Sequence, residues 1–313
     1  EKFKVGAYQR PLIVAEMSGN HDQSIERALK IVDLAAECGA DAIKLQTLSP
    51  NKITLNSERS EFLIKDKSNP WYGMKLYDLY TRTQTPLSWH KKIQQRAKKR
   101  GLIFFSSPFD EDAVDFLEDL NVPVYKLASF ENTHLPLIKK IARTGKPLII
   151  STGMATMSEI KTSVNTARDN GCTKIILLKC TSSYPSSVKE SNINGITKLQ
   201  KHFGCPVGLS DHTIGIGAAI ASISLGSALI EKHLTITSGD EGIDSSFSLD
   251  HKTFKHLVEE SKNAWESLGS YEIKPTKSEK ISKKFRRSIY TKEDIQKGEK
   301  FTSNNLIVVR PNV

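Results

Sequence analysis

Short apolar runs alternate with longer amphipathic runs along most of the chain, and this alternation predicts a repeated strand-then-helix unit. The strands are expected at residues 12–15, 42–45, 103–105, 124–127, 147–150, 174–178, 207–209 and 228–230. The helices are expected at residues 24–38, 86–100, 111–120, 135–143, 157–170, 191–203, 214–225 and 251–268. Strands this short and apolar, joined through helices, are typical of parallel strands buried on both faces. The pattern therefore predicts a (β/α)8 TIM barrel, with an open doubly wound sheet as the alternative.

Residues at the ends of the expected helices support these boundaries. Gly39 and Gly101 each follow a helical run, where a left-handed C-terminal cap favours glycine because it has no side chain to clash. Ser24 and Asp110 each precede a helical run and are expected to act as N-caps.

Two segments depart from the repeating unit. Residues 48–85 form an unusually long connection between a strand and its helix, and because this connection carries Trp71 and several tyrosines we interpret it as an inserted lid or an oligomer contact. The repeat stops after Gly269. We therefore expect a barrel domain over residues 1–269, a basic linker over 270–284 and a small module over 285–313, which is too short to hold much core alone.

The composition excludes several classes of protein. No apolar stretch is long enough to span a membrane, and the first residues lack the apolar core of a signal sequence, so a cytoplasmic protein is expected. The four cysteines contain no Cys-x-x-Cys pair and are expected to be small buried hydrophobes. The net charge of +10 is concentrated in residues 274–287, which leaves nucleic-acid binding as a remote alternative. A single aromatic side chain, Phe285, lies in this basic segment, which is too few to stack on successive bases, so no nucleic-acid partner is expected.

Two histidines, His212 and His233, each follow an apolar run late in the chain. If those runs are neighbouring parallel strands, the two imidazoles meet at one end of the barrel. A pair of buried, hydrogen-bonded histidines is the plainer interpretation, but two imidazoles at equivalent positions favour a divalent metal site.

Polar side chains also collect at the expected carboxyl end of every strand, where barrel enzymes place their active sites. The set includes Glu16, Lys44, Gln46, Ser107, Lys126, Ser129, Glu131, Ser151, Lys179, Ser182, Tyr184, Ser210 and Glu231. Lysines and hydroxyls that converge in this way are suited to binding a phosphate. The lysines could instead pair with Glu16, Glu131 and Glu231, and both arrangements can hold together. A Schiff-base aldolase that uses Lys126 or Lys179 is a further alternative.

Eight strings of the sequence together resemble the sialic acid synthase family, the synthases of nonulosonic acids, over essentially the whole chain. They are Ala15-Glu16-Met17-Ser18-Gly19-Asn20-His21, Lys44-Leu45-Gln46-Thr47, Phe105-Ser106-Ser107-Pro108-Phe109-Asp110, Tyr125-Lys126-Leu127-Ala128-Ser129-Phe130-Glu131, Ser151-Thr152-Gly153-Met154, Lys179-Cys180-Thr181-Ser182-Ser183-Tyr184-Pro185, Gly208-Leu209-Ser210-Asp211-His212-Thr213 and Ile230-Glu231-Lys232-His233. Trp71 with residues 75–80, and Asp244 with residues 245–250, are most similar to the pseudaminate branch of the family. The N-acetylneuraminate and legionaminate branches are the alternatives.

The resemblance implies a metal-dependent condensation of phosphoenolpyruvate with an acylamino aldose, which yields a nine-carbon 2-keto acid and phosphate. For the pseudaminate branch the aldose is 2,4-diacetamido-2,4,6-trideoxy-L-altrose. His212 and His233 would hold Mn2+ or Mg2+, Glu16, Glu131 and Lys126 would act in catalysis, and Tyr184 and Asp244 would line the sugar side. The phosphoenolpyruvate ligands implied are Lys44, Ser107, Lys126, Ser129, Ser151, Ser182 and Ser210, with Gln46 and Lys179 as further substrate-binding residues.

The last residues resemble an antifreeze-like (SAF) domain, through Arg286-Arg287-Ser288, Lys297-Gly298-Glu299 and Val309-Arg310-Pro311. From this resemblance we expect an incomplete form of that domain, with Asn312 where glycine is usual. The resemblance implies a domain-swapped homodimer in which Arg310 contacts the acyl group of a sugar in the partner subunit.

Overall fold

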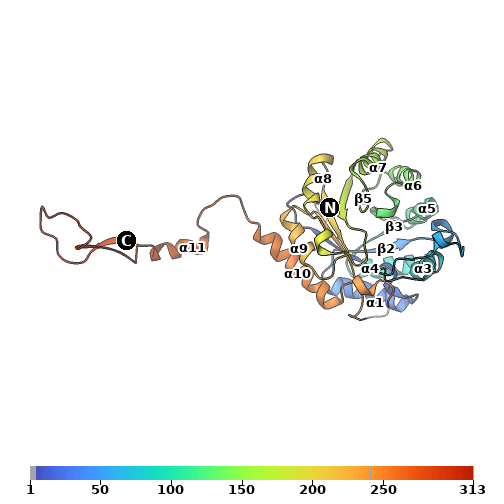
Figure 1. The fold of residues 1–313 in the computed structure, drawn as a ribbon, viewed down its shortest axis with the longest axis horizontal. Helices are drawn as coiled ribbons and strands as arrows, with labels where there is room; N and C mark the ends of the chain where they lie inside the picture. The colour runs from blue at the N-terminus through green and yellow to red at the C-terminus, as the bar shows by residue number, and fades with distance from the viewer. Residues whose placement is uncertain (1–4, 240–241, 313) are drawn as a thin grey trace. The chain divides into compact units, whose positions relative to one another are not determined.

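A closed barrel of parallel strands forms the first part of the chain (Figure 1). The computed structural model describes residues 5–239 and 242–312. The barrel strands are β1 (Leu12–Glu16), β2 (Ala42–Thr47), β3 (Ile103–Pro108), β4 (Tyr125–Leu127), β5 (Leu148–Ser151), β6 (Ile175–Cys180), β7 (Val207–Asp211) and β8 (Leu229–His233). Each strand pairs with the next along the chain, and β8 pairs with β1. The (β/α)8 barrel is therefore confirmed, and the open doubly wound sheet is wrong.

Helices surround the barrel and follow the strands as the sequence predicts. They are α1 (Ile25–Glu37), α4 (Leu87–Lys99), α5 (Glu111–Asp119), α6 (Leu135–Ala142), α7 (Met157–Asp169), α8 (Gly195–Phe203), α9 (Gly217–Ser224) and α10 (His251–Ser267). Both expected N-caps are confirmed, because Ser24 accepts a hydrogen bond from the backbone of Arg27 and Asp110 accepts one from Ala113. Within the described residues, no helix combines the length and the apolar character that crossing a bilayer requires.

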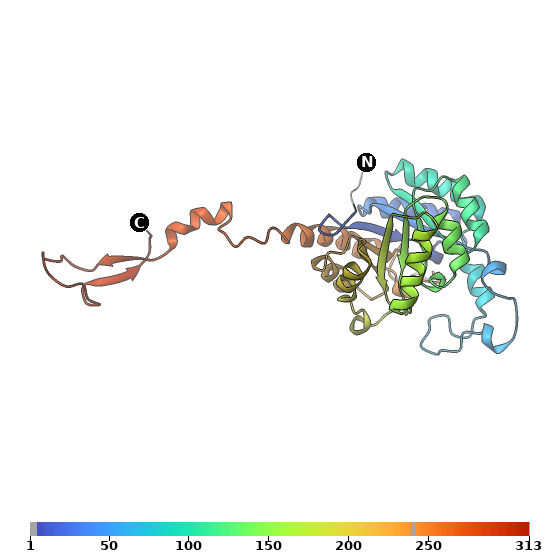
Figure 2. The same ribbon diagram turned by 90° about the horizontal axis from the view of Figure 1, so that it is seen from above.

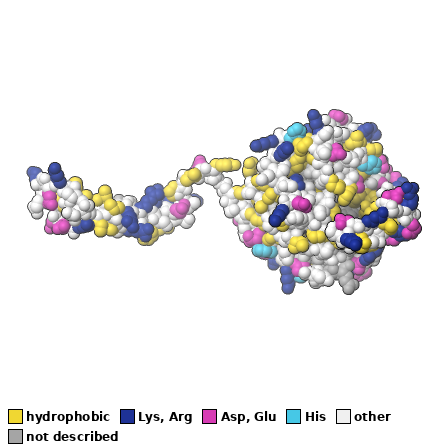
Figure 3. All heavy atoms as spheres, in the orientation of Figure 1, with side chains coloured by type: hydrophobic (Ala, Val, Ile, Leu, Met, Phe, Trp, Pro, Cys, Tyr) yellow, Lys and Arg dark blue, Asp and Glu magenta, His cyan; other side chains and the backbone are white. Residues whose placement is uncertain are grey.

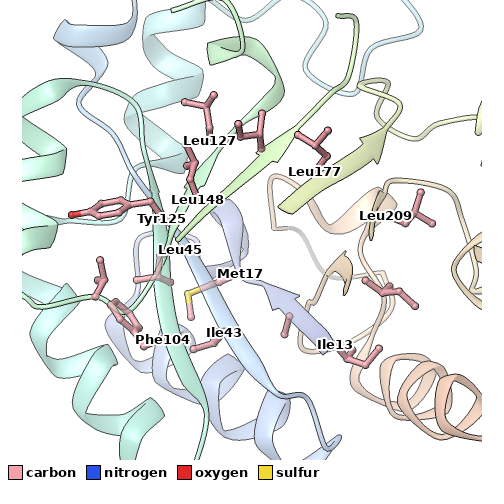
Figure 4. Packing of buried hydrophobic residues seen from close by; sticks show 14 of the residues in the cluster. Ile13, Met17, Ile43, Leu45, Phe104, Tyr125, Leu127, Leu148, Leu177 and Leu209 are labelled. Atoms are coloured by element: carbon pink, nitrogen blue, oxygen red, sulfur yellow. The ribbon is translucent and has the colours of Figure 1, made fainter. Parts of the chain in front are cut away.

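Successive side chains on each barrel strand point to opposite faces, and this alternation builds two apolar layers. Outward-facing side chains pack beneath the helices, as Figure 4 shows for residues from β1 through β7. The inner layer fills the barrel toward the amino ends of its strands and contains Val14, Ala42, Phe105, Ile149, Leu178 and Leu229. Inward positions nearer the carboxyl ends of the strands are polar, so the chemistry of the interior changes along the barrel axis.

The long connection between β2 and α4 is folded and lies at one end of the barrel (Figure 2). It contains the short helices α2 (Pro50–Ile53) and α3 (Leu76–Thr83). The indole N–H of Trp71 donates a hydrogen bond to the Ile243 carbonyl, 2.9 Å away, and ties this segment to the connection that follows β8. We call residues 48–85 the lid segment.

The chain divides into two compact units after Leu268, and the second unit begins at Gly269. The second unit contains α11 (Lys277–Ser282) and an antiparallel pair of strands, β9 (Ser288–Thr291) and β10 (Leu306–Val309). Basic and hydrophobic side chains both cover its visible surface (Figure 3). α11 lies within the range that the sequence analysis takes for a linker.

Candidate active site

The carboxyl ends of the strands surround a cavity of about 740 Å³. The alternation that places Val14, Ala42 and Leu229 inside the barrel also places Glu16, Lys44 and Glu231 inside it, two residues further along β1, β2 and β8. The cavity is lined by these three residues together with Gln46, Lys126, Ser129, Glu131, Ser151, Ser182, Tyr184, Ser210, His212, His233 and Asp244. Side chains that the sequence places in seven separate strand-and-helix units are thus brought into one site.

Two buried lysines share carboxylate partners at the base of the cavity. Lys44 Nζ lies 2.7 Å from Glu16 and 3.7 Å from Glu231, and Lys126 Nζ lies 3.8 Å from Glu231. The expected pairing of the lysines with Glu16 and Glu231 is confirmed. Because Glu231 bridges the two ammonium groups, it holds both lysines in place without a ligand.

The two carboxylates of this cluster differ in acidity. Burial raises the pKa of Glu16, and the neighbouring Glu231 adds to the effect, which together outweigh Lys44. Burial also favours a raised pKa for Glu231, but Lys126 and Lys44 outweigh it and keep the pKa low. Neighbouring groups whose pKa values are pushed apart are suited to different roles, one as a proton donor and one as a fixed charge.

One hydroxyl group contacts the ammonium group of Lys126, and two more lie beside Gly153. Lys126 Nζ donates a hydrogen bond to Ser151 Oγ at 2.7 Å. The Gly153 backbone N–H donates to Ser129 Oγ at 3.2 Å, and a Cβ on Gly153 would lie 2.1 Å from Ser182 Oγ. Glycine is therefore required at this position, because any side chain would displace the hydroxyls. The cluster of an ammonium group, three hydroxyls and a close backbone has the donors that a phosphate requires.

The two predicted metal-binding histidines face each other, with ring centroids 5.3 Å apart. His212 Nδ1 lies 3.0 Å from the Thr181 carbonyl, which can only accept, so Nδ1 carries a proton and the lone pair of Nε2 is available to a metal when the ring is neutral. His233 Nδ1 is buried and has no hydrogen-bond partner among the described residues. Both rings line the same cavity as the lysine and hydroxyl cluster.

This donor set fits a divalent cation bound by two imidazoles, with the remaining ligands from substrate and water. The first ring is oriented by a carbonyl, and the second has a buried nitrogen that lacks a partner. Burial next to His212 and three lysines lowers the pKa of His233 well below its usual range, so it is neutral and able to bind a metal. Within the described residues no group of three or more His, Cys, Asp and Glu side chains is arranged as a metal site.

Glu131 follows β4 and lines the cavity with one carboxylate oxygen, Oε2, buried and unpartnered among the described residues. Burial raises its pKa to about 7. A carboxyl group with a pKa near the working pH is suited to general acid–base catalysis. The expected pairing of Glu131 with a lysine is not seen, because no ion pair joins it to a lysine among the described side chains.

Aromatic rings form the outer wall of the cavity. The Trp71 ring of the lid segment lies 5.6 Å from Tyr184, and Tyr184 lies 4.5 Å from His212 between ring centroids. Phe247 joins this wall 5.0 Å from His233. Asp244 also lines the cavity, and its carboxylate accepts hydrogen bonds from the Ser18 hydroxyl and the Gly19 N–H. This outer half offers both apolar surface and a carboxylate to a second substrate.

Three predicted substrate-binding residues do not line the cavity. Lys179 is displaced because alternation on β6 turns Ile176, Leu178 and Cys180 inward and Lys179 outward, where its ammonium group bonds the Cys180 carbonyl and the Thr181 hydroxyl. Ser107 points inward but lies beneath Lys44, to which it is hydrogen-bonded at 3.3 Å. Arg310 belongs to the second unit. A position at a strand end alone predicts that Lys179 lies in the site, whereas the alternation along β6 predicts that it faces outward.

Cys180 lines the cavity, although the sequence analysis interprets the cysteines only as small buried hydrophobes. Burial raises the pKa of its thiol, but His212 and other neighbours outweigh this effect and bring the pKa to about 6. Glu231, which the sequence places at the end of its strand as a partner for the lysines, is the centre of the charged cluster. Counting residues in steps of two from Leu178 and Leu229 would have identified both positions.

Comparisons with known proteins agree with this geometry. Pseudaminic acid synthase of Helicobacter pylori is 43% identical over 97% of this chain and 89% of its own length, and N,N'-diacetyllegionaminic acid synthase of Campylobacter jejuni is 35% identical over 97% of this chain and 91% of its own. The crystal structure of N-acetylneuraminic acid synthetase from Leptospira borgpetersenii, in complex with citrate, matches with a TM-score of 0.79 and 29% identity over 90% of this chain and 93% of that one. The NeuB family model matches residues 31–273. The chain belongs to the NeuB family.

Proposed function

We propose that this protein is a pseudaminic acid synthase, which condenses phosphoenolpyruvate and water with 2,4-diacetamido-2,4,6-trideoxy-L-altrose to give pseudaminic acid and phosphate. The observation that carries the proposal is the single cavity in which Lys126, Ser151 and the paired histidines meet beneath an aromatic wall. The likeness to the pseudaminic acid synthase of Helicobacter pylori, stronger than that to the legionaminic enzyme, favours this sugar.

Phosphoenolpyruvate binds at the base of the cavity, with its phosphate at Lys126 and the hydroxyls of Ser129, Ser151 and Ser182. Lys44 neutralises the second anionic group. A ligand anion close to Glu16 further favours the protonated form of that carboxyl group, since burial already raises its pKa. The charge of Lys44 that Glu16 balances in the free protein is then available to the ligand.

The aldose binds in the outer half of the cavity, between the aromatic wall and Asp244, with its open-chain aldehyde toward His212 and His233. A Mn2+ or Mg2+ ion held by the two imidazoles would polarise the aldehyde oxygen. Carbon 3 of the enol forms a bond to the aldehyde carbon, and Glu16 gives its proton to the aldehyde oxygen. Glu231, whose pKa stays low, then faces the cationic carbon 2 with a full negative charge.

Water adds to carbon 2, and Glu131 accepts one of its protons. The unpartnered oxygen of Glu131 is free to receive that proton, and a pKa of about 7 lets it do so near neutral pH. In the resulting tetrahedral adduct the hydroxyl proton passes to the leaving phosphate as its bond to carbon 2 breaks, which forms the ketone and inorganic phosphate. Solvent returns a proton from Glu131 to Glu16 and restores the starting state.

A phosphate-release assay over a panel of sugars tests the proposal. We expect phosphate only when phosphoenolpyruvate, the diacetamido-altrose and Mn2+ are all present, and loss of release with a chelator. N-acetylmannosamine and the diacetamido sugar of legionaminate synthesis serve as the comparison substrates. Release with one of these sugars alone would assign the protein to another branch, and no release with any sugar would contradict the proposal.

The proposal extends to a cytoplasmic homodimer with an antifreeze-like second unit. Size-exclusion chromatography with light scattering tests the dimer. The contact of Arg310 with a sugar stays a prediction, and Arg310→Ala tests it. Its expected effect is a higher KM for the aldose with an unchanged KM for phosphoenolpyruvate.

A further inference from the structure

A buried ion pair lies on the outer face of the barrel, directly behind the two histidines. Lys232 Nζ lies 2.7 Å from Asp211 Oδ2, and Lys232 is wholly buried. Asp211 pairs with Lys232 across the β7–β8 ladder. Each charged residue immediately precedes one of the histidines, so the pair joins the ends of the two strands that carry them.

Charges are unexpected at this place, because the same face of β7 and β8 is otherwise apolar. Leu209 on β7 and Ile230 on β8 lie two residues before Asp211 and Lys232, and both belong to the core beneath the helices. The lysine and hydroxyl cluster of the cavity lies on the opposite face, so substrate does not reach this pair. A role for the charges has to act through the residues that they hold.

The pair fixes the backbone directly after His212. Asp211 Oδ1 accepts a hydrogen bond from the Thr213 N–H at 2.9 Å, while Lys232 donates to the Thr213 carbonyl. The His212 carbonyl accepts a further hydrogen bond from the Ser186 N–H at 3.0 Å. The backbone on which the His212 ring is mounted is therefore held from β8 as well as from β7.

We propose that Asp211 and Lys232 are positioning residues, which set the separation and orientation of His212 and His233 for a divalent cation. The inference rests on the metal site of the proposed function. Imidazole ligands bind a metal tightly only when their rings are held in place, and loss of a supporting contact typically weakens metal affinity by about 10–100-fold. An apolar pair could fill the same space but would release the backbone of Thr213.

The test is a paired substitution, Asp211→Leu with Lys232→Met, which removes both charges and leaves neither one buried alone. Mn2+ binding is measured from the EPR signal of the free ion, which does not depend on turnover. We expect the unfolding temperature to stay within a few degrees and the Kd for Mn2+ to rise about 10–100-fold. A folded double variant with an unchanged Kd would overturn the inference.

Two further variants keep the test decisive. Asp211→Asn preserves the side-chain volume and the acceptor for Thr213, and is expected to weaken Mn2+ binding by a smaller factor. Arg10→Met with Asp41→Leu removes another ion pair, between residues that precede β1 and β2, in which Asp41 also accepts a hydrogen bond from the Ile13 N–H of β1 at 2.8 Å. This control is expected to change stability without changing the Kd for Mn2+. Equal weakening in the control would contradict a specific positioning role.

The outcomes separate this inference from the proposed function. Normal Mn2+ binding by the unmodified protein without phosphate release would reject the proposed reaction. The positioning role would still be decided by the Kd for Mn2+ of the double variant. Absence of Mn2+ binding by the unmodified protein would overturn the inference together with the metal site. Weakened binding in the double variant alone supports the inference whatever the sugar is.

Discussion

The ammonium group of Lys126 donates a hydrogen bond to the Ser151 hydroxyl at 2.7 Å, and both groups line the cavity. Lys179 is also a strand-end lysine, but it faces away from the cavity. The two lysines therefore form a matched pair for substitution.

Lys126→Met is expected to raise the KM for phosphoenolpyruvate by roughly 10–100-fold, because a hydrogen bond to a charged group contributes about 1.5–3 kcal/mol. Lys179→Met should leave that KM within about threefold, since the phosphate does not reach it. Steady-state kinetics with saturating sugar measure both. Equal effects of the two substitutions would show that the orientation of β6 is wrong.

Glu131 is expected to control the acidic limb of the pH profile. Its pKa of about 7 means that the base form is lost as the pH falls below neutral, so kcat should decrease in acid. Glu131→Gln should lower kcat by about 10²–10⁴-fold and remove this limb. The measurement is phosphate release between pH 5.5 and pH 9 at saturating substrates. A limb near pH 7 that persists in the variant would assign it to another group.

His21 and His90 are expected to make the protein less stable in acid. Burial is the main reason that the pKa of each is lowered to about 4, so the unfolded state binds protons that the folded state does not between their usual pKa of 6.5 and that value. Their contribution is present above pH 6.5 and is lost as the pH falls toward 4, by up to about 3 kcal/mol for each histidine. Urea unfolding at pH 7.5 and pH 5 measures the change.

His90→Gln should reduce this pH dependence, and His256→Gln, on an exposed side chain, should not. His90 also receives a hydrogen bond from the Thr47 hydroxyl, 2.8 Å away, so the variant is expected to be less stable at both pH values. The informative quantity is the difference between the two pH values rather than the stability at either one. Identical differences in both variants would contradict the assignment.

Trp71 is expected to connect the lid segment to the sugar site. Trp71→Phe keeps a ring beside Tyr184 but loses the hydrogen bond to the Ile243 carbonyl, whereas Trp71→Ala loses both. We expect the KM for the sugar to rise by about 3–10-fold in the first variant and by more than tenfold in the second, with the KM for phosphoenolpyruvate little changed. An equal increase in both KM values would indicate a general disturbance of the cavity.

The barrel could be predicted from the sequence because its signals are local. Each strand is a short apolar run, and helix boundaries are marked by residues such as Ser24 and Asp110, whose capping bonds the structure contains. The approximate site could be predicted for a related reason, since parallel strands in a barrel end on the same side. His212 and His233 met there because β7 and β8 are neighbours.

What the sequence did not reveal depends on orientation and on contacts between distant residues. Lys179 was placed in the site because a position at a strand end does not say which face a side chain occupies. The bridging role of Glu231 depends on lysines from β2 and β4, which lie far away in the sequence. Asp211 and Lys232 each follow an apolar run, at a place where polar residues predict a site inside the barrel. The sequence does not indicate that these two side chains pair on the outer face.

The apolar inner layer that contains Phe105, Leu178 and Leu229 closes the barrel below the charged cluster. Ligands consequently approach from the lid side. A molecule that binds in the deepest subsite has to pass the outer subsites to reach it. If phosphoenolpyruvate occupies that subsite, a sugar already seated against Trp71 and Tyr184 would obstruct its entry. The shape of the interior thus favours an obligatory sequence of arrivals, with the small anion first and the larger partner second.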